Sequence, residues 1–317
     1  MNAMNESVPL TYKAIPRILC ATDLTPRCEG AVRRATLSAK QMDAQLLLVH
    51  VVDEAQPPEL IGSQVERAQI ALEARQLTSA AEVAVRVGRP NRTIARVVGE
   101  WGADLVVLGA YRERSRDRLF GSIAERAIRA AGRPVLLVND EPSGSYRDVL
   151  LASDLSDAFV QVIRMTQQLG LLEGASASIV HALPQVTRSM FYPAGVTKSE
   201  IDQLMHSLRW SARRDLVAQL NAAGLDSARF RIVQKQGTPI GAIASAVEQM
   251  KPQLLVIGAT RHPILKRMVG ASVARQVLRV IDCDVLIASM SAARSSRHGR
   301  PRLALPEAAA AQWPTYW

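Results

Sequence analysis

The chain has few cysteines and few aromatic residues for its length of 317 residues. Its three cysteines, Cys20, Cys28 and Cys283, are too few and too scattered for a disulfide framework. Cysteines and histidines also lack the spacing of a zinc site. Aromatic residues make up 4% of the chain and apolar residues 48%. The composition therefore predicts a protein of a reducing compartment with cores built mainly from Val, Leu, Ile and Ala.

Long apolar runs are missing as well. No run reaches the roughly 18 residues that indicate a membrane-spanning helix. Residues 1–20 lack the charged-then-apolar pattern that is typical of a secretory signal. We therefore expect a cytoplasmic protein with no membrane partner.

The formal net charge of +10 raises the question of a nucleic-acid partner. Residues 291–317 hold four arginines against one glutamate, which leaves +7 for the rest of the chain. Neither half shows the basic stripe with interleaved aromatic residues that is typical of RNA-binding modules. We expect no specific nucleic-acid partner, and the Pro- and Ala-rich segment 291–317 is predicted to be a basic, disordered tail.

An internal repeat organises the sequence. Residues 105–138 and 254–287 are near-copies, each an apolar strand, a basic loop, a helix start and a second apolar strand. Three matched pairs lie 149 residues apart: Gly109 with Gly258, Arg112 with Arg261, and Gly121 with Gly270. The chain is therefore interpreted as a tandem duplication, with domains at 14–142 and 146–290 around a linker at 143–145.

The pattern within each half predicts alternating strands and helices. In the first half we expect strands at 17–23, 44–52, 82–87, 105–109 and 134–139, with helices at about 26–42 and 63–80, one ending near 101, and one starting at 122. The second half repeats this order, with about 18 extra residues before a helix that a capping box of Thr197 and Glu200 begins. Strands that alternate with helices pair in parallel. The predicted fold class is α/β, with two tandem doubly wound parallel sheets of five strands.

Ligands of such sheets bind beyond the carboxyl ends of the strands, where the strand order reverses. Asp23 and Asp154 follow the first strand of each half, and Gly109 and Gly258 end the fourth. Gly121-Ser122 stands at a helix start, where free backbone N–H groups favour a phosphate. The loop before it holds four arginines against two acids. These features predict a site for a phosphorylated ligand.

This arrangement resembles the universal stress protein family. The resemblance covers about residues 14–140 and 146–290 and implies a Rossmann-like, adenine nucleotide alpha-hydrolase-like fold in each half. It implies ATP or ADP as a regulatory ligand, with Mg²⁺ accompanying the nucleotide. It also implies that the strands at 134–139 and 284–289 pair, so that the halves form an intramolecular pseudo-dimer, which could pair further as a homodimer. The nucleotide-binding positions implied are Thr22, Asp23, Val51, Gly109, Arg112, Gly121, Ser122, Ile123, Asp154, Gly258, Arg261, Gly270 and Ser272.

The sequence departs from the family's phosphate loop at two kinds of position. Arg112 and Arg261 stand where the family has its second glycine, and the spacer that follows has eight residues instead of nine. Ala271 replaces the hydroxyl residue of the second half, although Ser272 follows it. An arginine cannot let the backbone approach phosphates as glycine does, but its guanidinium can contact them.

Other interpretations of these residues stay open. Asp23 and Asp154 could simply cap the helices after them, Gly121-Ser122 could be a helix start without a ligand, and His50 and His181 are expected in the core. The leading function is a non-catalytic stress-response protein, and the main alternative is a ligand-free scaffold that recruits an unidentified protein. A slow ATPase is the third, although no catalytic base can be identified.

Overall fold

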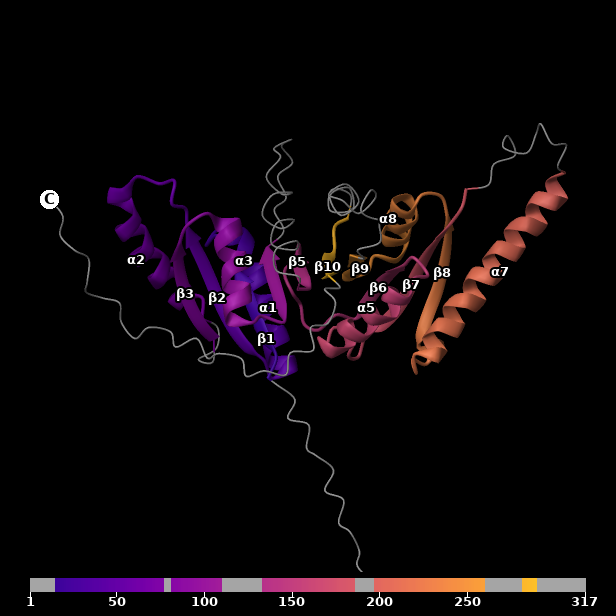
Figure 1. Cartoon of the computed structure of the whole chain (residues 1–317), viewed down its shortest axis with the longest axis horizontal. Coiled ribbons are helices and arrows are strands. Elements are labelled where there is room, and N and C mark those ends of the chain that lie inside the picture. Colours follow the sequence, from indigo (N-terminus) through magenta and orange to yellow (C-terminus); the bar gives the residue numbers. More distant parts are fainter. Residues whose placement is uncertain (1–14, 77–80, 110–132, 186–196, 260–280, 290–317) are drawn as a thin grey trace, which may run out of the picture.

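The computed structural model describes residues 15–76, 81–109, 133–185, 197–259 and 281–289. The described strands form one ten-stranded sheet in the order β3-β2-β1-β4-β5-β10-β9-β6-β7-β8 (Figure 1). The strands of the first half are β1 (Arg17–Ala21), β2 (Gln45–Val52), β3 (Ala81–Val87), β4 (Leu105–Gly109) and β5 (Val135–Val138). Those of the second half are β6 (Asp148–Ser153), β7 (Ser176–Leu183), β8 (Phe230–Gln236), β9 (Leu254–Ala259) and β10 (Asp284–Ser289).

Within each half all pairings are parallel, as the alternation of strands and helices predicts. The two halves join where β5 pairs with β10 in antiparallel fashion, with Leu136 opposite Leu286. This pairing confirms the expected pseudo-dimer. It also removes two apolar strand edges from solvent, which would otherwise be free to pair with other chains.

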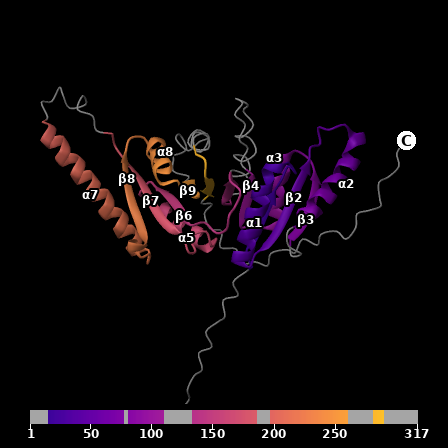
Figure 2. The same cartoon turned by 180° about the vertical axis from the view of Figure 1, so that it is seen from behind.

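Helices cover both faces of the sheet (Figures 1 and 2). One face packs against α1 (Glu29–Met42), α2 (Pro58–Ala74), α5 (Asp157–Gln168) and α7 (Lys198–Ala222). The other packs against α3 (Pro90–Trp101) and α8 (Pro239–Met250). Successive residues of the central strands alternate between the two cores: Ile18 belongs to one and Leu19 to the other. Because both faces are covered, these strands are continuous apolar runs.

The expected helix at 63–80 was wrong in its boundaries. α2 begins at Pro58 and ends at Ala74. A proline is tolerated at the start because its missing backbone N–H would have no helical partner in the first turn. A pair of prolines such as Pro57-Pro58 is also typical of a loop, which is why the sequence pattern places the start of this helix too late. By contrast, the capping box before α7 is confirmed, since Thr197 and Glu200 exchange side-chain and backbone hydrogen bonds. The helix expected from residue 122 and the tail at 291–317 lie outside the described residues.

A buried charged cluster lies at the junction of the two halves. The Asp284 carboxylate accepts hydrogen bonds from the Tyr146 hydroxyl at 2.6 Å and the Asn139 backbone N–H at 2.8 Å. Arg34 of α1 stacks on the Tyr146 ring, with its Nε 3.5 Å from Asp284 Oδ2. Its Nη1 donates to the Gly144 carbonyl at 2.6 Å. Residues of both domains thus contact the Asp284 carboxylate, and the linker joins the cluster through Arg34.

No helix in the described parts of the chain is long and apolar enough to cross a membrane.

Candidate functional site

The strand order reverses beside the first strand of each half. β1 lies between β2 and β4, and β6 lies between β7 and β9. The chain leaves β1 toward β2 and β3 and returns to its other side with β4, and open α/β sheets bind their ligands at the carboxyl ends of the strands at such a reversal. Asp23 follows β1 and Gly109 ends β4, so the structure brings these two expected site residues to the same reversal. Asp154 and Gly258 occupy the equivalent places beside β6 and β9.

A tight turn follows β1. Asp23 Oδ1 accepts hydrogen bonds from the Thr25 backbone N–H at 2.9 Å and from the Thr25 hydroxyl at 2.7 Å. The Thr22 hydroxyl oxygen accepts a bond from the Leu24 N–H at 3.0 Å. Leu24 is held at φ 64°, a left-handed conformation that is costly for a branched side chain. The polar side chains on either side of Leu24 therefore stabilise a strained backbone.

The second half builds the same turn with different hydroxyl residues. Asp154 Oδ1 accepts bonds from the Ser156 N–H at 3.0 Å and the Ser156 hydroxyl at 2.6 Å. The Ser153 hydroxyl oxygen accepts from the Leu155 N–H, and Leu155 has φ 58°. In both halves the aspartate thus organises the turn before a helix, and these bonds use only one of its two carboxylate oxygens.

Side chains from distant parts of the chain fix these turns. The Leu24 carbonyl accepts a hydrogen bond from Arg75 Nη2 at 2.9 Å, and the Leu155 carbonyl accepts one from Gln219 Nε2 at 2.8 Å. Arg75 also forms an ion pair with Glu29 at 2.8 Å. Sequence reasoning missed Arg75 and Gln219, because nothing in the spacing of the repeat links them to the turns.

The expected core histidines contact the backbone of the same turns. His50 Nδ1 lies 2.9 Å from the Thr22 carbonyl oxygen, and His181 Nδ1 lies 3.0 Å from that of Ser153. Both rings are partly buried at the ends of β2 and β7. A carbonyl oxygen can only accept, so Nδ1 carries the proton in each ring.

Gly109 makes room for the segment that follows β1. A Cβ atom at this position would lie 2.9 Å from the Sγ of Cys28, which belongs to a short 3-10 helix at Pro26–Cys28. At Gly258 an added Cβ would lie 3.1 Å from Cγ2 of Val162 in α5. Packing alone thus favours glycine at position 109, whereas at position 258 a Cβ atom needs only a shift of Val162 by a few tenths of an ångström.

The site of the first half carries a negative charge. Partial burial raises the pKa of Asp23, but hydrogen bonds from Thr25 and Cys28 outweigh it and hold this pKa below the ordinary value. Burial raises the pKa of the Cys28 thiol to about 11. Asp23 is therefore an exposed, ionised acceptor at neutral pH, while Cys28 is a neutral thiol.

The remaining expected site residues divide into two groups. Thr22 is buried in the turn, and Val51 lies half-buried near the end of β2 beside β1. The others lie outside the described residues: Arg112, Gly121, Ser122, Ile123, Arg261, Gly270 and Ser272. No group of three His, Cys, Asp or Glu side chains that could hold a metal ion occurs within the described ranges.

The exposed carboxylate oxygens of Asp23 suit the hydroxyl groups of a ribose, which donate hydrogen bonds. Thr22 precedes Asp23 at the end of β1, and Val51 lies near the end of the adjacent strand β2.

Comparison with known proteins agrees with this architecture. A universal stress protein from Archaeoglobus fulgidus DSM 4304 is 15% identical, with 87% of this chain and 98% of that chain covered and a TM-score of 0.61. A functionally unknown protein from Pseudomonas aeruginosa PAO1 is 18% identical, with 87% and 92% covered and a TM-score of 0.58. At these identities the likeness shows the fold alone.

A shorter universal stress protein from Archaeoglobus fulgidus, solved in complex with dAMP, is 23% identical over 39% of this chain and 96% of its own, with a TM-score of 0.31. A search of the curated proteins found no match. The model of the universal stress protein family matches residues 14–139 and again residues 145–289. This chain belongs to the universal stress protein family and is a tandem member of it.

Proposed function

We propose that this chain is a non-catalytic, cytoplasmic stress-response protein that binds an adenine nucleotide, ATP or ADP, as a regulatory ligand. The main support is the strained turn beside β1, where Asp23 holds an exposed carboxylate at the reversal of strand order. Strained backbone that the surroundings hold in place is concentrated at functional sites. The same turn recurs beside β6, so each half has a candidate site.

In this proposal Asp23 accepts hydrogen bonds from the ribose, and Val51 lies against the base. The phosphates would meet Gly121-Ser122, where the sequence predicts a helix start, and the neighbouring arginines. Mg²⁺ would accompany the nucleotide by binding its phosphate oxygens. The complexes with cAMP and dAMP that are known for shorter family members are properties of those proteins.

Calorimetric titration of the full chain with ATP and with ADP tests the proposal. We expect Asp23→Ala to weaken binding about tenfold, in line with the loss of one or two hydrogen bonds to a charged acceptor. Asp226→Ala is the matched control, because Asp226 forms a similar turn with the Ala228 N–H before β8, at the amino end of an edge strand. Equal affinity of the wild-type chain and Asp23→Ala would contradict the assignment of Asp23.

The same samples test whether the protein is non-catalytic. We expect no release of inorganic phosphate from ATP above the rate without protein. Hydrolysis that is lost in Asp23→Ala but kept in Asp226→Ala would show an enzyme and overturn this part of the proposal.

A ligand-free scaffold is the second candidate function, and one observation favours it. Gly109 is already required by the packing of Cys28, and Oδ1 of Asp23 is already used by Thr25. These residues would therefore be retained without any ligand. A chain that binds neither ATP nor ADP, and yet keeps a protein partner, would favour the scaffold.

A further inference from the structure

The two ends of the molecule expose apolar side chains on helices. α2 lies at one end and α7 at the other in both views (Figures 1 and 2). Six large apolar side chains are exposed in the described parts of the chain, and four of them lie on these two helices. They are Leu60 and Ile70 on α2, and Leu204 and Trp210 on α7.

The outer face of α2 is acidic. Ile70 is 62% exposed and stands one turn from Glu66 and one turn from Glu73 on the same side of the helix. The helix as a whole carries three glutamates against one arginine, a net charge of −2.

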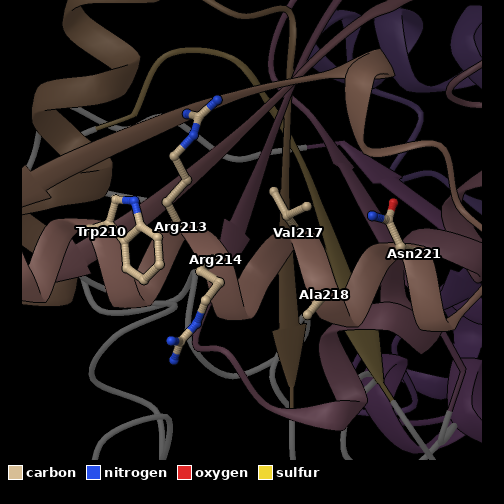
Figure 3. A pocket seen from close by; sticks show the side chains of 6 residues that line it. All are labelled: Trp210, Arg213, Arg214, Val217, Ala218 and Asn221. Carbon is tan, nitrogen blue, oxygen red and sulfur yellow. The ribbon is translucent and has the colours of Figure 1, made fainter.

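The outer face of α7 is basic. Trp210 is 59% exposed, and the guanidinium of Arg214 lies 5.2 Å from the centre of its ring. A shallow groove runs along this face beside the indole (Figure 3). Its lining residues are Trp210, Arg213, Arg214, Val217, Ala218 and Asn221. From residue 209 to 221 the helix holds three arginines against one aspartate, a net charge of +2.

The two helices are copies of each other in the duplication, since each lies between the second and third strands of its half. The fully buried Leu72 and Leu220 align them with an offset of 148 residues, as do the buried Ala68 and Leu216. With this offset Glu66 corresponds to Arg214. Arg67 corresponds to Asp215, so the order of the two charges is inverted between the copies.

Large and small residues are exchanged at two further positions. Trp210 corresponds to Gly62, and Ile70 corresponds to Ala218. A glycine inside a helix costs about 1 kcal/mol relative to alanine, and nothing lies within 4 Å of a Cβ atom placed at Gly62. Packing within the chain therefore does not explain Gly62.

We propose that copies of this chain associate end to end, with the outer face of α2 of one copy on the outer face of α7 of the next. With the helices parallel and in register, Glu66 meets Arg214, whereas Arg67 and Asp215 lie on opposite sides of the contact and Asp215 keeps its ion pair with Arg214 of its own chain. The indole of Trp210 covers the flat surface at Gly62, and Ile70 enters the groove beside Ala218. Because the contact joins two different surfaces, it leaves a free α2 at one end and a free α7 at the other, so association can continue beyond two copies.

A single pair of helices buries less surface than a standard interface, so the contact is weak. Sedimentation velocity of the full chain over a range of concentrations should show species larger than a monomer at high concentration. Their fraction should fall as salt rises, because exposed charges are screened. A wild-type chain that remains a monomer at every concentration would overturn the proposal.

Charge reversals identify the surfaces. Arg214→Glu and Glu66→Arg should each weaken self-association at least tenfold. The double variant Glu66→Arg/Arg214→Glu should restore it, and so should an equimolar mixture of the two single variants. Arg96→Glu is the matched control, since Arg96 is exposed on α3 at the other face of the sheet. Failure of both the double variant and the mixture to associate would contradict the pairing of Glu66 with Arg214.

Other occupants of α7 are outcomes of the same experiment. A wild-type chain that stays a monomer alone, but sediments faster with a single-stranded oligonucleotide or with a polyglutamate peptide, would assign the basic face to that ligand and overturn self-association. The nucleotide site does not enter the proposal, and these variants leave it unchanged.

Discussion

The two halves of this protein are alike where the first strand ends and differ where they meet and at their outer ends. Asp23 and Asp154 form the same hydrogen bonds, and both turns hold a leucine at positive φ. At the junction, by contrast, the buried Asp284 of the second half corresponds to Pro134 of the first. The two halves thus share the same turn after their first strand, whereas their residues at the junction differ.

The junction shows what this asymmetry does. Arg34 contacts Tyr146 and Asp284, whereas its counterpart 131 residues later is the apolar Met165. Burial raises the pKa of Asp284, although hydrogen bonds from Tyr146, Asn139 and Asp140 oppose it. One charged cluster at the junction therefore holds the two halves together. A second, symmetry-related cluster would have buried twice the charge.

Breaking this cluster should have the largest effect on stability. Asp284→Ala leaves the buried Arg34 and the Tyr146 hydroxyl without their partner, and we expect the free energy of unfolding to fall by about 3–5 kcal/mol. Chemical denaturation of the full chain measures it. Arg33→Ala is the control, because the ion pair of Arg33 with Glu141 is about half exposed and should contribute at most about 1 kcal/mol. Equal losses in the two variants would mean that the cluster does not hold the halves together.

The two glycines at the strand ends should respond differently to a methyl group. Gly109→Ala places a Cβ atom against Cys28 Sγ, and we expect a loss of about 1–3 kcal/mol. Gly258→Ala should cost less, since the Val162 side chain can shift by the few tenths of an ångström required. Adding Cys28→Ala to Gly109→Ala should recover part of the loss in a double-mutant cycle. Additive losses would show that Cys28 is not the obstacle.

The two turns should be equally important for stability. Asp23→Ala and Asp154→Ala each remove the two hydrogen bonds that Thr25 or Ser156 donates to the carboxylate, and we expect each to lower the free energy of unfolding by about 1 kcal/mol. Thermal or chemical unfolding compares them. A loss in only one of the variants would break the equivalence of the halves.

The smallest predicted effects concern pH. The pKa of Asp23 is lower in the folded chain than its ordinary value of about 3.9, so ionised Asp23 stabilises the fold at neutral pH and this benefit is lost as pH falls through the folded pKa. The stability difference between wild type and Asp23→Asn should therefore shrink in acid. Asp284 has a raised pKa, so its ionisation opposes folding, and the difference between wild type and Asp284→Asn should grow in acid. Denaturation series between about pH 7 and pH 3 compare the two variants. If the stability difference between wild type and each variant does not change over this pH range, the expected directions of both pKa shifts are contradicted.

Much of the fold follows from patterns within short stretches of sequence. Continuous apolar runs predicted the buried parallel strands, and Thr197 with Glu200 predicted the start of α7. The aspartates at the strand ends were also identified, because their place in the repeat marks the reversal of strand order. The pairing of β5 with β10 came from the family resemblance, and the repeat itself gives no register for it.

Long-range contacts could not be predicted in the same way. Arg75 is 51 positions from Leu24 in the sequence, and Gln219 is 64 positions from Leu155, yet each contacts that turn. The cluster of Arg34, Tyr146 and Asp284 likewise joins three separate segments. A local pattern also misled at Pro57-Pro58, since a pair of prolines is typical both of a loop and of the first turn of a helix.

The most direct measurement of the proposed function is to purify the full chain without added nucleotide, denature it and chromatograph what is released. The account predicts an adenine nucleotide in near-stoichiometric amount, which is absent after Gly121→Asp and reduced after Asp23→Ala. A purified chain that releases no nucleotide, and that shows no affinity for ATP or ADP by calorimetry, would contradict nucleotide binding and leave the ligand-free scaffold.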